Sequence, residues 1–226
     1  VGARPVFVDI DSATWNINPS GIEKAITKRT KAILPVHFAG RPCNMEKINA
    51  IAVRHKLKVI EDAAQAFGSR YRGEWIGSGK NFVSFSFHPM KEITTIEGGA
   101  LILPNEDLLT LAKRLRFHGI EKDAWKTFKG VQTDVPYDVS VVGYKYNMSD
   151  VSAALGLSQL ERERRFAKRR REIAHIYTSA LAPEKTITLP LRDSEASESS
   201  WNLFHIVLND GISRQEFMAD LKQNGV

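Results

Sequence analysis

Hydrophobic residues occur along this chain in short blocks with two different spacings. Compact apolar blocks bounded by polar turn residues predict strands at residues 5–9, 32–36, 58–60, 83–87, 100–103 and 201–208. Apolar residues three or four positions apart predict helices that begin at Pro19 and after Asn44, Asn105, Ser149 and Ser213. Residues 71–76, with Gly73 near the middle, predict a small hairpin. Because strands and helices alternate, we expect an α/β fold with a largely parallel sheet covered by helices.

The helix predicted from Ser149 to about Ala182 contains the one run of charged residues, ERERRFAKRRRE at 161–172. Clustered basic residues attract phosphate backbones, so a nucleic-acid-binding module is one alternative. Glutamates interrupt the run, however, and the apolar residues beside it predict an inward stripe at Phe166, Ile173, Ile176 and Tyr177. The pattern therefore favours a solvated helix face with paired charges and no nucleic-acid partner. Further on, the polar stretch 194–200 predicts a linker.

Composition narrows the class of protein. The chain has 226 residues, of which 42% are hydrophobic, enough for a substantial core. A net charge of +6 suits anionic ligands such as phosphates or nucleotides. The single cysteine, Cys43, allows no internal disulfide and is typical of a reducing compartment. No apolar run is long enough to span a membrane and no signal peptide is recognisable, so we expect a cytoplasmic protein with no membrane partner.

Candidate chemistry lies where two predicted strands end. Asp62 follows the strand at 58–60, and Lys91 lies in the polar turn between 83–87 and 100–103, near Gly98 and Gly99. Ligands of open α/β sheets bind beyond the carboxyl ends of the strands. An amine in such a place can attack an aldehyde when its surroundings favour the neutral form. A carboxylate there can pair with the cationic ring nitrogen of pyridoxal phosphate. The alternative for Lys91 is a solvated loop lysine.

Three motifs carry a resemblance to a known family. EDAAQAFGS at 61–69, SFSFHPMKEITTIEGGALIL at 84–103 and GYKYNMSDVSAALGLSQL at 143–160 resemble the sugar aminotransferases of the DegT/DnrJ/EryC1/StrS family. The resemblance implies an aspartate-aminotransferase-like large domain of pyridoxal-phosphate fold type I with a mainly parallel sheet. It also implies part of a small α+β C-terminal domain. The expected division is 1–148 for the large domain, 149–182 for a connecting helix and 183–226 for the small domain.

The resemblance also implies a role for individual residues. Lys91 matches the catalytic lysine that binds pyridoxal 5'-phosphate covalently, and Asp62 matches the partner of the pyridine nitrogen. Gln65 matches the residue near the ring oxygen, and Ser86 matches the serine that binds the cofactor phosphate. Asn147, in the GYKYN motif, matches the residue that reaches the phosphate in the other protomer, which implies a homodimer with shared active sites. No metal ligands are expected.

His37, which follows the strand at 32–36, could border the cofactor, but a histidine in this position is more often a structural hydrogen-bonding residue. Residues 119–142, with Trp125, Phe128, Pro136 and Tyr137, predict an ordered loop that packs on a partner or covers a substrate. The segment HGIEKDAW at 118–125 most resembles the branch of the family that makes 4-amino-4-deoxy sugars.

The implied reaction moves an amino group from glutamate to a nucleotide-linked keto sugar, in the 4-keto or 3-keto form. The product would enter a polysaccharide, a lipopolysaccharide or a glycosylated natural product. Two alternatives share the scaffold: a pyridoxal-phosphate-dependent sugar dehydratase, in which histidine replaces the lysine, and a truncated non-catalytic paralogue. We read the sequence as the middle of a longer enzyme, because family segments at both ends are not matched. A dinucleotide-dependent oxidoreductase is not supported, since no G-x-G-x-x-G follows the first strand.

Overall fold

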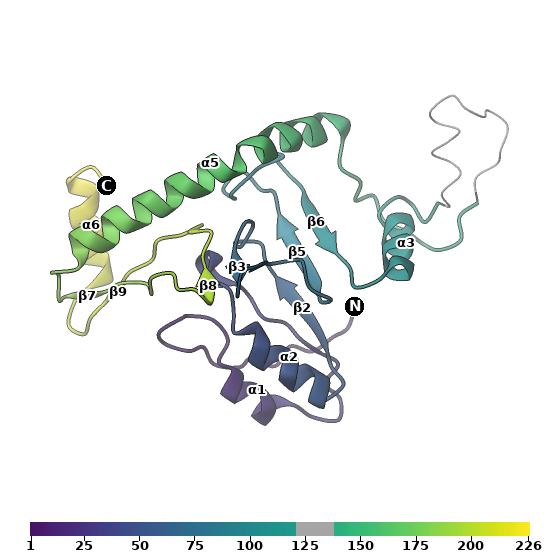
Figure 1. Ribbon diagram of the computed structural model, residues 1–226, viewed down its shortest axis with the longest axis horizontal. Coiled ribbons are helices and arrows are strands. Elements are labelled where there is room, and N and C mark those ends of the chain that lie inside the picture. Colours follow the sequence, from purple (N-terminus) through teal and green to yellow (C-terminus); the bar gives the residue numbers. More distant parts are fainter. Residues whose placement is uncertain (121–137) are drawn as a thin grey trace.

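The computed structural model describes residues 1–120 and 138–226, and the loop and branch predictions that rest on Trp125, Phe128, Pro136 and Tyr137 lie outside the described residues. The centre of the fold is a four-stranded sheet in the order β1-β2-β5-β6 (Figure 1). Its strands are β1 (Ala32–Ile33), β2 (Lys58–Asp62), β5 (Phe82–Ser86) and β6 (Gly99–Ile102). The first three run parallel and β6 runs antiparallel to β5. The predicted α/β fold with a largely parallel sheet is confirmed.

One face of this sheet is covered by two helices. Helices α1 (Pro19–Ala25) and α2 (Met45–Arg54) pack against Ile33 and Val59, which are partners in the register of β1 and β2 and so lie on the same face. On the other face Ile60 and Leu101 are exposed, as is Leu34 just after β1, among residues 1–120 and 138–226. The core therefore lies on the helix side of the sheet (Figure 1).

Asparagine and serine side chains begin four helices where the sequence predicts them. Each accepts a hydrogen bond from a backbone N–H in the first turn, which otherwise lacks a partner. The pairs are Asn44 with α2, Asn105 with α3 (Glu106–Leu115), Ser149 with α5 (Asp150–Leu181) and Ser213 with α6 (Arg214–Gln223). Leu108 and Leu115 of α3 are only half-buried. Within the described residues, no helix has the length and apolar character needed to cross a membrane.

The predicted hairpin is confirmed as β3 (Arg70–Tyr71) and β4 (Glu74–Trp75). Its turn residues, Arg72 and Gly73, both have positive φ, as a two-residue turn of this kind requires. A third strand, β8 (Ser197–Glu198), pairs with β3. The prediction of a linker at 194–200 is therefore wrong, because distant residues supply the backbone partners that polar side chains do not reveal.

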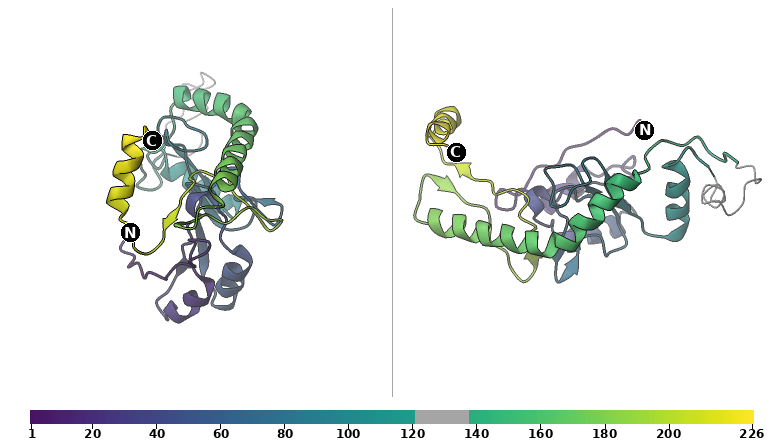
Figure 2. Two further views of the ribbon diagram at one scale, coloured as in Figure 1. Left: turned by 90° about the vertical axis from the view of Figure 1, so that its left-hand side faces the viewer. Right: turned by 90° about the horizontal axis from the view of Figure 1, so that it is seen from above.

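Helix α5 is the longest element and extends from beside the β5–β6 hairpin to the C-terminal segments (Figures 1 and 2). The predicted length is confirmed, but the predicted inward stripe is wrong at Ile173, Ile176 and Tyr177, and Phe166 is only half-buried. Ile176 is 57% exposed and Tyr177 49% exposed. The buried positions are instead Glu163, Ala167, Ala174 and Thr178, which repeat at four, seven and four residues. Two residues of the charged run, Glu163 and Arg170, thus face the protein rather than the solvent.

Three predicted strands are shorter than expected or absent. Residues 5–9 form no strand; only Ile10 bridges to Ile17, and Phe7 is 92% exposed. The strand at 32–36 shrinks to β1, with an isolated bridge between Val36 and Asp62. From 201–208 only β9 (Val207–Leu208) pairs, with β7 (Ile187–Thr188). Apolar content alone does not make a strand, since each strand also needs a partner for its backbone groups. The domain division at 148 and 182 stays a prediction.

Candidate active site

Asp62 and Ser86 end two neighbouring parallel strands at the same edge of the sheet. Asp62 is opposite Ser84 in the register of β2 and β5, and Ser86 lies two residues beyond Ser84. Residues two apart in a strand point to the same face, so Asp62 and Ser86 share one face and one edge. Asp62 Oδ1 accepts a hydrogen bond from Ala64 N at 3.0 Å, and within the described residues Oδ2 has no partner. The carboxylate can therefore accept a further donor.

The loop that carries Lys91 joins β5 to β6. Backbone hydrogen bonds close its base, from Phe87 N to Gly98 O at 2.9 Å and from Thr95 N to Phe87 O at 3.0 Å. Lys91 N donates to His88 O at 2.9 Å, which forms a turn at the tip. The Lys91 side chain is half-buried, and its Nζ has no hydrogen-bond or ion-pair partner among residues 1–120 and 138–226. A free amine thus lies in the loop that follows the strand ending at Ser86.

The two glycines of this loop permit the close approach of β5 and β6. A Cβ on Gly99 would lie 2.6 Å from Phe85 O, far inside the normal contact distance. A Cβ on Gly98 would collide with Thr95 Oγ1, and its φ of 155° lies at the limit of the left-handed region. The glycine pair is therefore a steric requirement of the hairpin that holds Lys91.

Gln65 lies in the turn after β2. Its side-chain Oε1 accepts a hydrogen bond from Ala39 N at 2.7 Å, which leaves the amide N–H groups available to a ligand. Ala39 lies in the short helix η1 (Phe38–Gly40) and has a positive φ. The side chain thus fixes the turn that follows β1 to the turn that follows β2.

Asn147 lies just before α5. Its Oδ1 accepts a hydrogen bond from Lys145 Nζ at 2.6 Å. The next residue, Met148, packs beside the base of the Lys91 loop, since a Cβ on Gly98 would lie 2.8 Å from Met148 Cε. Within the described part of the chain, Asn147 makes no hydrogen bond to Asp62, Gln65, Ser86 or Lys91. The structure places four of the candidates around one edge and the fifth on a segment that contacts their loop.

A buried histidine contacts this edge from the opposite face of the sheet. His37 is fully buried, and its Nδ1 accepts a hydrogen bond from Cys43 N at 3.0 Å. The hydrogen therefore lies on Nε2, which donates to Glu61 Oε2 at 2.8 Å. His37 N also donates to Asp62 O at 3.0 Å. These contacts agree with the structural role that the sequence favours for His37, because its ring lies with Glu61 on the face opposite to Asp62.

Three functional candidates were missed in the sequence: Glu92, Arg170 and Ser200. Glu92 and Ser200 are buried and Arg170 is half-buried, and hydrogen bonds at Ser200 link all three next to Lys91. Glu92 follows Lys91 directly, which was a usable signal. Arg170 lies in the charged run and Ser200 in the predicted linker, and no local pattern in either segment distinguishes these two residues from solvated ones.

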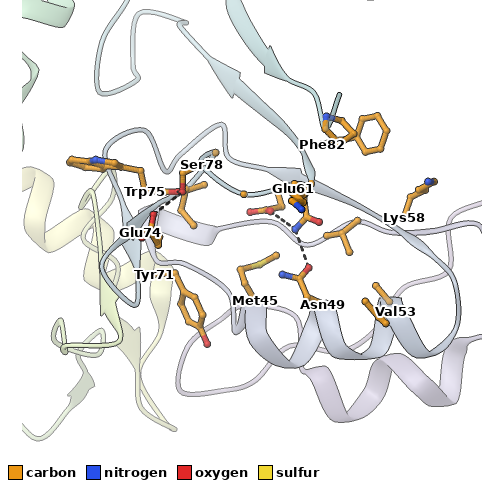
Figure 3. A pocket seen from close by; sticks show the side chains of 18 of the residues that line it. Met45, Asn49, Val53, Lys58, Glu61, Tyr71, Glu74, Trp75, Ser78 and Phe82 are labelled. Atoms are coloured by element: carbon orange, nitrogen blue, oxygen red, sulfur yellow. Dashed lines mark hydrogen bonds between the residues drawn. The ribbon is translucent and has the colours of Figure 1, made fainter. Parts of the chain in front are cut away.

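A hollow of about 780 Å³ opens at the other end of the parallel strands (Figure 3). It is lined by Lys58 and Phe82, which begin β2 and β5, and by Trp75 from β4. Glu61, at its inner wall, accepts a hydrogen bond from Asn81 Nδ2 at 2.7 Å. This hollow is thus separate from the edge that carries Asp62, Ser86 and Lys91.

Comparison with known proteins decides the family. The sequence pattern of the DegT/DnrJ/EryC1/StrS aminotransferase family matches residues 1–226. The chain belongs to this family. Family members depend on pyridoxal phosphate. The expected aspartate-aminotransferase-like fold is confirmed by the structural similarities that follow.

Three similar proteins illustrate the match. Uncharacterized protein MJ1066 from Methanocaldococcus jannaschii is 43% identical over 227 residues, which cover 99% of this chain and 58% of that protein. The sugar aminotransferase CalS13 from Micromonospora echinospora is 31% identical with a TM-score of 0.85, over 96% of this chain and 58% of CalS13. Spr1654 from Streptococcus pneumoniae, in its PLP form, is 31% identical with a TM-score of 0.88, over 100% of this chain and 60% of Spr1654. The chain thus spans somewhat more than half the length of the proteins it matches.

The side chains at the sheet edge fit the family's cofactor. A carboxylate with a free oxygen, a hydroxyl and a free amine stand at Asp62, Ser86 and Lys91. Ser86 Oγ accepts from His88 N at 3.3 Å, and its own hydrogen remains available to a phosphate oxygen. These are the three chemical groups that a phosphorylated pyridine aldehyde requires.

Proposed function

We propose that this chain forms the cofactor-binding part of a pyridoxal-phosphate-dependent sugar aminotransferase. The observation that carries the proposal is the free amine of Lys91 in the loop that follows β5, together with Asp62 and Ser86 at one edge of the sheet. Membership of the aminotransferase family supports the reaction class.

Each residue has a distinct role in this proposal. Pyridoxal phosphate would supply an electron sink for the carbanion that forms when a donor loses its α-proton. Asp62 would keep the ring nitrogen protonated, and Gln65 would lie near the ring oxygen. Lys91 Nζ would attach to the aldehyde carbon. Once the amino donor displaces it, Lys91 Nζ would take the α-proton as general base and return it as general acid.

Phosphate binding would involve two chains. Ser86 would donate its hydroxyl hydrogen to the phosphate of its own chain, and Asn147 would reach the phosphate of the partner in a homodimer. Tyr144 and Tyr146 support an interface here, because their rings stack at 4.9 Å and remain exposed beside Asn147. Exposed stacked aromatics are typical of contact surfaces.

The proposed amino donor is glutamate, and the proposed acceptor is a nucleotide-linked keto sugar, most simply a 4-keto sugar. The product would serve polysaccharide, lipopolysaccharide or natural-product glycan synthesis. The resemblance of the three motifs and the sugar aminotransferases among the similar structures support the sugar acceptor. We place the enzyme in the cytoplasm, which agrees with the free, buried Cys43.

The dehydratase remains the second candidate on this scaffold. Lys91 argues against it, since the relatives with that activity have histidine at this position. The non-catalytic paralogue is tested by the experiment that follows.

The experiment is a cofactor titration of the intact protein, followed by borohydride reduction and peptide mapping. We expect a visible absorption band with pyridoxal phosphate and a reduced adduct on Lys91. Glutamate should bleach the band in the unreduced protein. Lys91→Ala should abolish the band and turnover, whereas Lys47→Ala, at an exposed position of α2, should leave both unchanged. A folded protein that takes up no cofactor, or turnover that persists in Lys91→Ala, would refute the proposal.

A further inference from the structure

The loop that carries Lys91 is tied to the rest of the chain through the next residue, Glu92. Glu92 is 4% exposed, and its Oε1 lies 2.7 Å from the Oγ of Ser200, which is also buried. Ser200 Oγ lies 2.8 Å from Gln65 O, in the turn after β2. Ser200 O accepts a hydrogen bond from Arg170 Nε at 3.0 Å. Four segments distant in sequence therefore meet at one serine.

The hydroxyl of Ser200 has a single hydrogen and two oxygen neighbours. The backbone oxygen of Gln65 can only accept a hydrogen bond, and an ionised carboxylate can also only accept. One hydrogen cannot satisfy both contacts, and the contact left over would bring two oxygen lone pairs together. If Glu92 carries a proton, Glu92 donates to Ser200 Oγ and Ser200 donates to Gln65 O. Both short distances are then hydrogen bonds.

The charges around Glu92 do not compensate for its burial. Arg170 from α5 and Lys91 from its own loop are the charged groups that act on it, and both favour ionisation. Burial has the larger effect and raises the pKa of Glu92. Arg170 directs Nε to Ser200 O and Nη1 to Glu92 O, at 3.5 Å, rather than to the carboxylate. Among the described residues Glu92 Oε2 has no hydrogen-bond partner, which is costly for a charge and mild for a neutral acid.

We propose that Glu92 is held as a neutral carboxylic acid that donates its hydrogen to Ser200 Oγ, and that this link positions the Lys91 loop against the Gln65 turn and α5. Glu92 is thus a positioning residue. The positioning of Lys91 for the cofactor rests on the proposed function, whereas the protonated state of Glu92 does not depend on it.

The proton is tested by infrared spectroscopy of the intact protein at neutral pH. We expect the wild-type minus Glu92→Gln difference spectrum to contain the carbonyl band of a protonated carboxyl group. Glu97→Gln is the matched control, because Glu97 lies in the same loop and is exposed; its difference spectrum should contain only carboxylate bands. A Glu92→Gln difference with carboxylate bands alone would overturn the proposal, whether or not the protein binds pyridoxal phosphate.

Stability as a function of pH gives a second test of the proton. A carboxyl whose pKa is raised by folding contributes stability that is complete below the unfolded pKa and is lost as the pH rises through the folded pKa. Wild type should therefore lose stability with rising pH relative to Glu92→Gln, in which the neutral amide can still donate to Ser200. Parallel pH profiles for the two proteins would contradict a neutral Glu92.

The positioning role is tested by trapping pyridoxal phosphate on Lys91 with borohydride. Glu92→Leu and Ser200→Ala both remove the link, and we expect the trapping rate to fall at least fivefold in each, while Glu92→Gln restores it to within about twofold of wild type. Ser200→Ala keeps the test decisive if Glu92→Leu does not fold. Wild-type rates in folded Ser200→Ala would refute the positioning role. Absence of trapping in wild type would instead refute the proposed function.

Discussion

His37 Nε2 donates a hydrogen bond to Glu61 Oε2 at 2.8 Å in the core. Glu61 directly precedes Asp62 in β2. The side chains of His37 and Glu61 are buried, and Asn81 Nδ2 donates to the second oxygen of Glu61 at 2.7 Å. The carboxylate therefore has a donor at each oxygen, and the strand end that carries Asp62 is built on this arrangement.

Replacing His37 with Leu should destabilise the protein strongly, because Glu61 then keeps a buried oxygen without its donor. We expect a loss of about 3 kcal/mol in the free energy of unfolding, measured by urea denaturation of the intact protein. His55→Leu is the control, since His55 contacts Glu23 at the surface at 3.3 Å, and it should cost less than about 0.5 kcal/mol. Equal effects of the two changes would show that the buried contact has no special weight.

Cys43 should be unreactive in the folded protein. The thiol is fully buried, and burial together with the nearby Glu61 carboxylate raises its pKa. Because the thiolate is the reactive form, a disulfide reagent at neutral pH should label Cys43 only after denaturation. Peptide mapping of labelled native and urea-unfolded protein measures this, with Cys43→Ala as the blank. Rapid labelling of Cys43 in the native protein would contradict the burial that the structure shows.

Gly99→Ala should disrupt the hairpin that carries Lys91. The new Cβ would lie 2.6 Å from Phe85 O, so the two strands would have to separate. We expect a loss of about 1–3 kcal/mol in stability, together with weaker cofactor binding. Thermal unfolding and a pyridoxal phosphate titration measure the two effects. Gly79→Ala is the matched control, because a Cβ there meets nothing within 4 Å. If Gly99→Ala has the thermal stability and cofactor affinity of wild type, the steric requirement for glycine at this position is refuted.

Asp62→Asn tests the pairing of this carboxylate with a protonated ring nitrogen. The side-chain oxygen can still accept from Ala64 N, so the fold should be retained, but the negative charge is lost. We expect turnover to fall by roughly 10²-fold or more, because a fixed charge that stabilises the reacting state is removed. Steady-state kinetics measure this loss. Asp210→Asn, at an exposed loop position, should keep wild-type turnover. Full activity in Asp62→Asn would remove Asp62 from the proposed site.

Local signals in the sequence predicted the helices and the hairpin well. The N-caps of α2, α3, α5 and α6 and the positive φ of Arg72 and Gly73 depend on neighbouring residues, so short patterns suffice. Strands failed where the partner is distant. The pairing of β8 with β3 and the unpaired state of residues 5–9 depend on contacts across the chain.

The candidate site divides in the same way. Asp62 and Lys91 follow predicted strands and Ser86 lies at the end of one, so their common edge could be inferred from the order of the elements. Glu92 and Ser200 are 108 residues apart, and their contact exists only once α5 and the C-terminal segment are in place. The inward positions on α5 do not follow its apolar residues. Charged Glu163 is buried and charged Arg170 is half-buried, whereas hydrophobic Ile176 is exposed.

Helix α5 has a mechanical consequence. It packs by Gly156 against Thr95 in the Lys91 loop, since a Cβ on Gly156 would lie 2.7 Å from Thr95 Cγ2, and it contacts Phe204 through Tyr177. At a rise of 1.5 Å per residue, the arm from Gly156 to Leu181 is about 38 Å long. A rotation of about 5° around Gly156 therefore moves the far end by about 3 Å. If α5 moves as a rigid rod, a small rotation at the Lys91 loop is accompanied by a large displacement of the C-terminal segments.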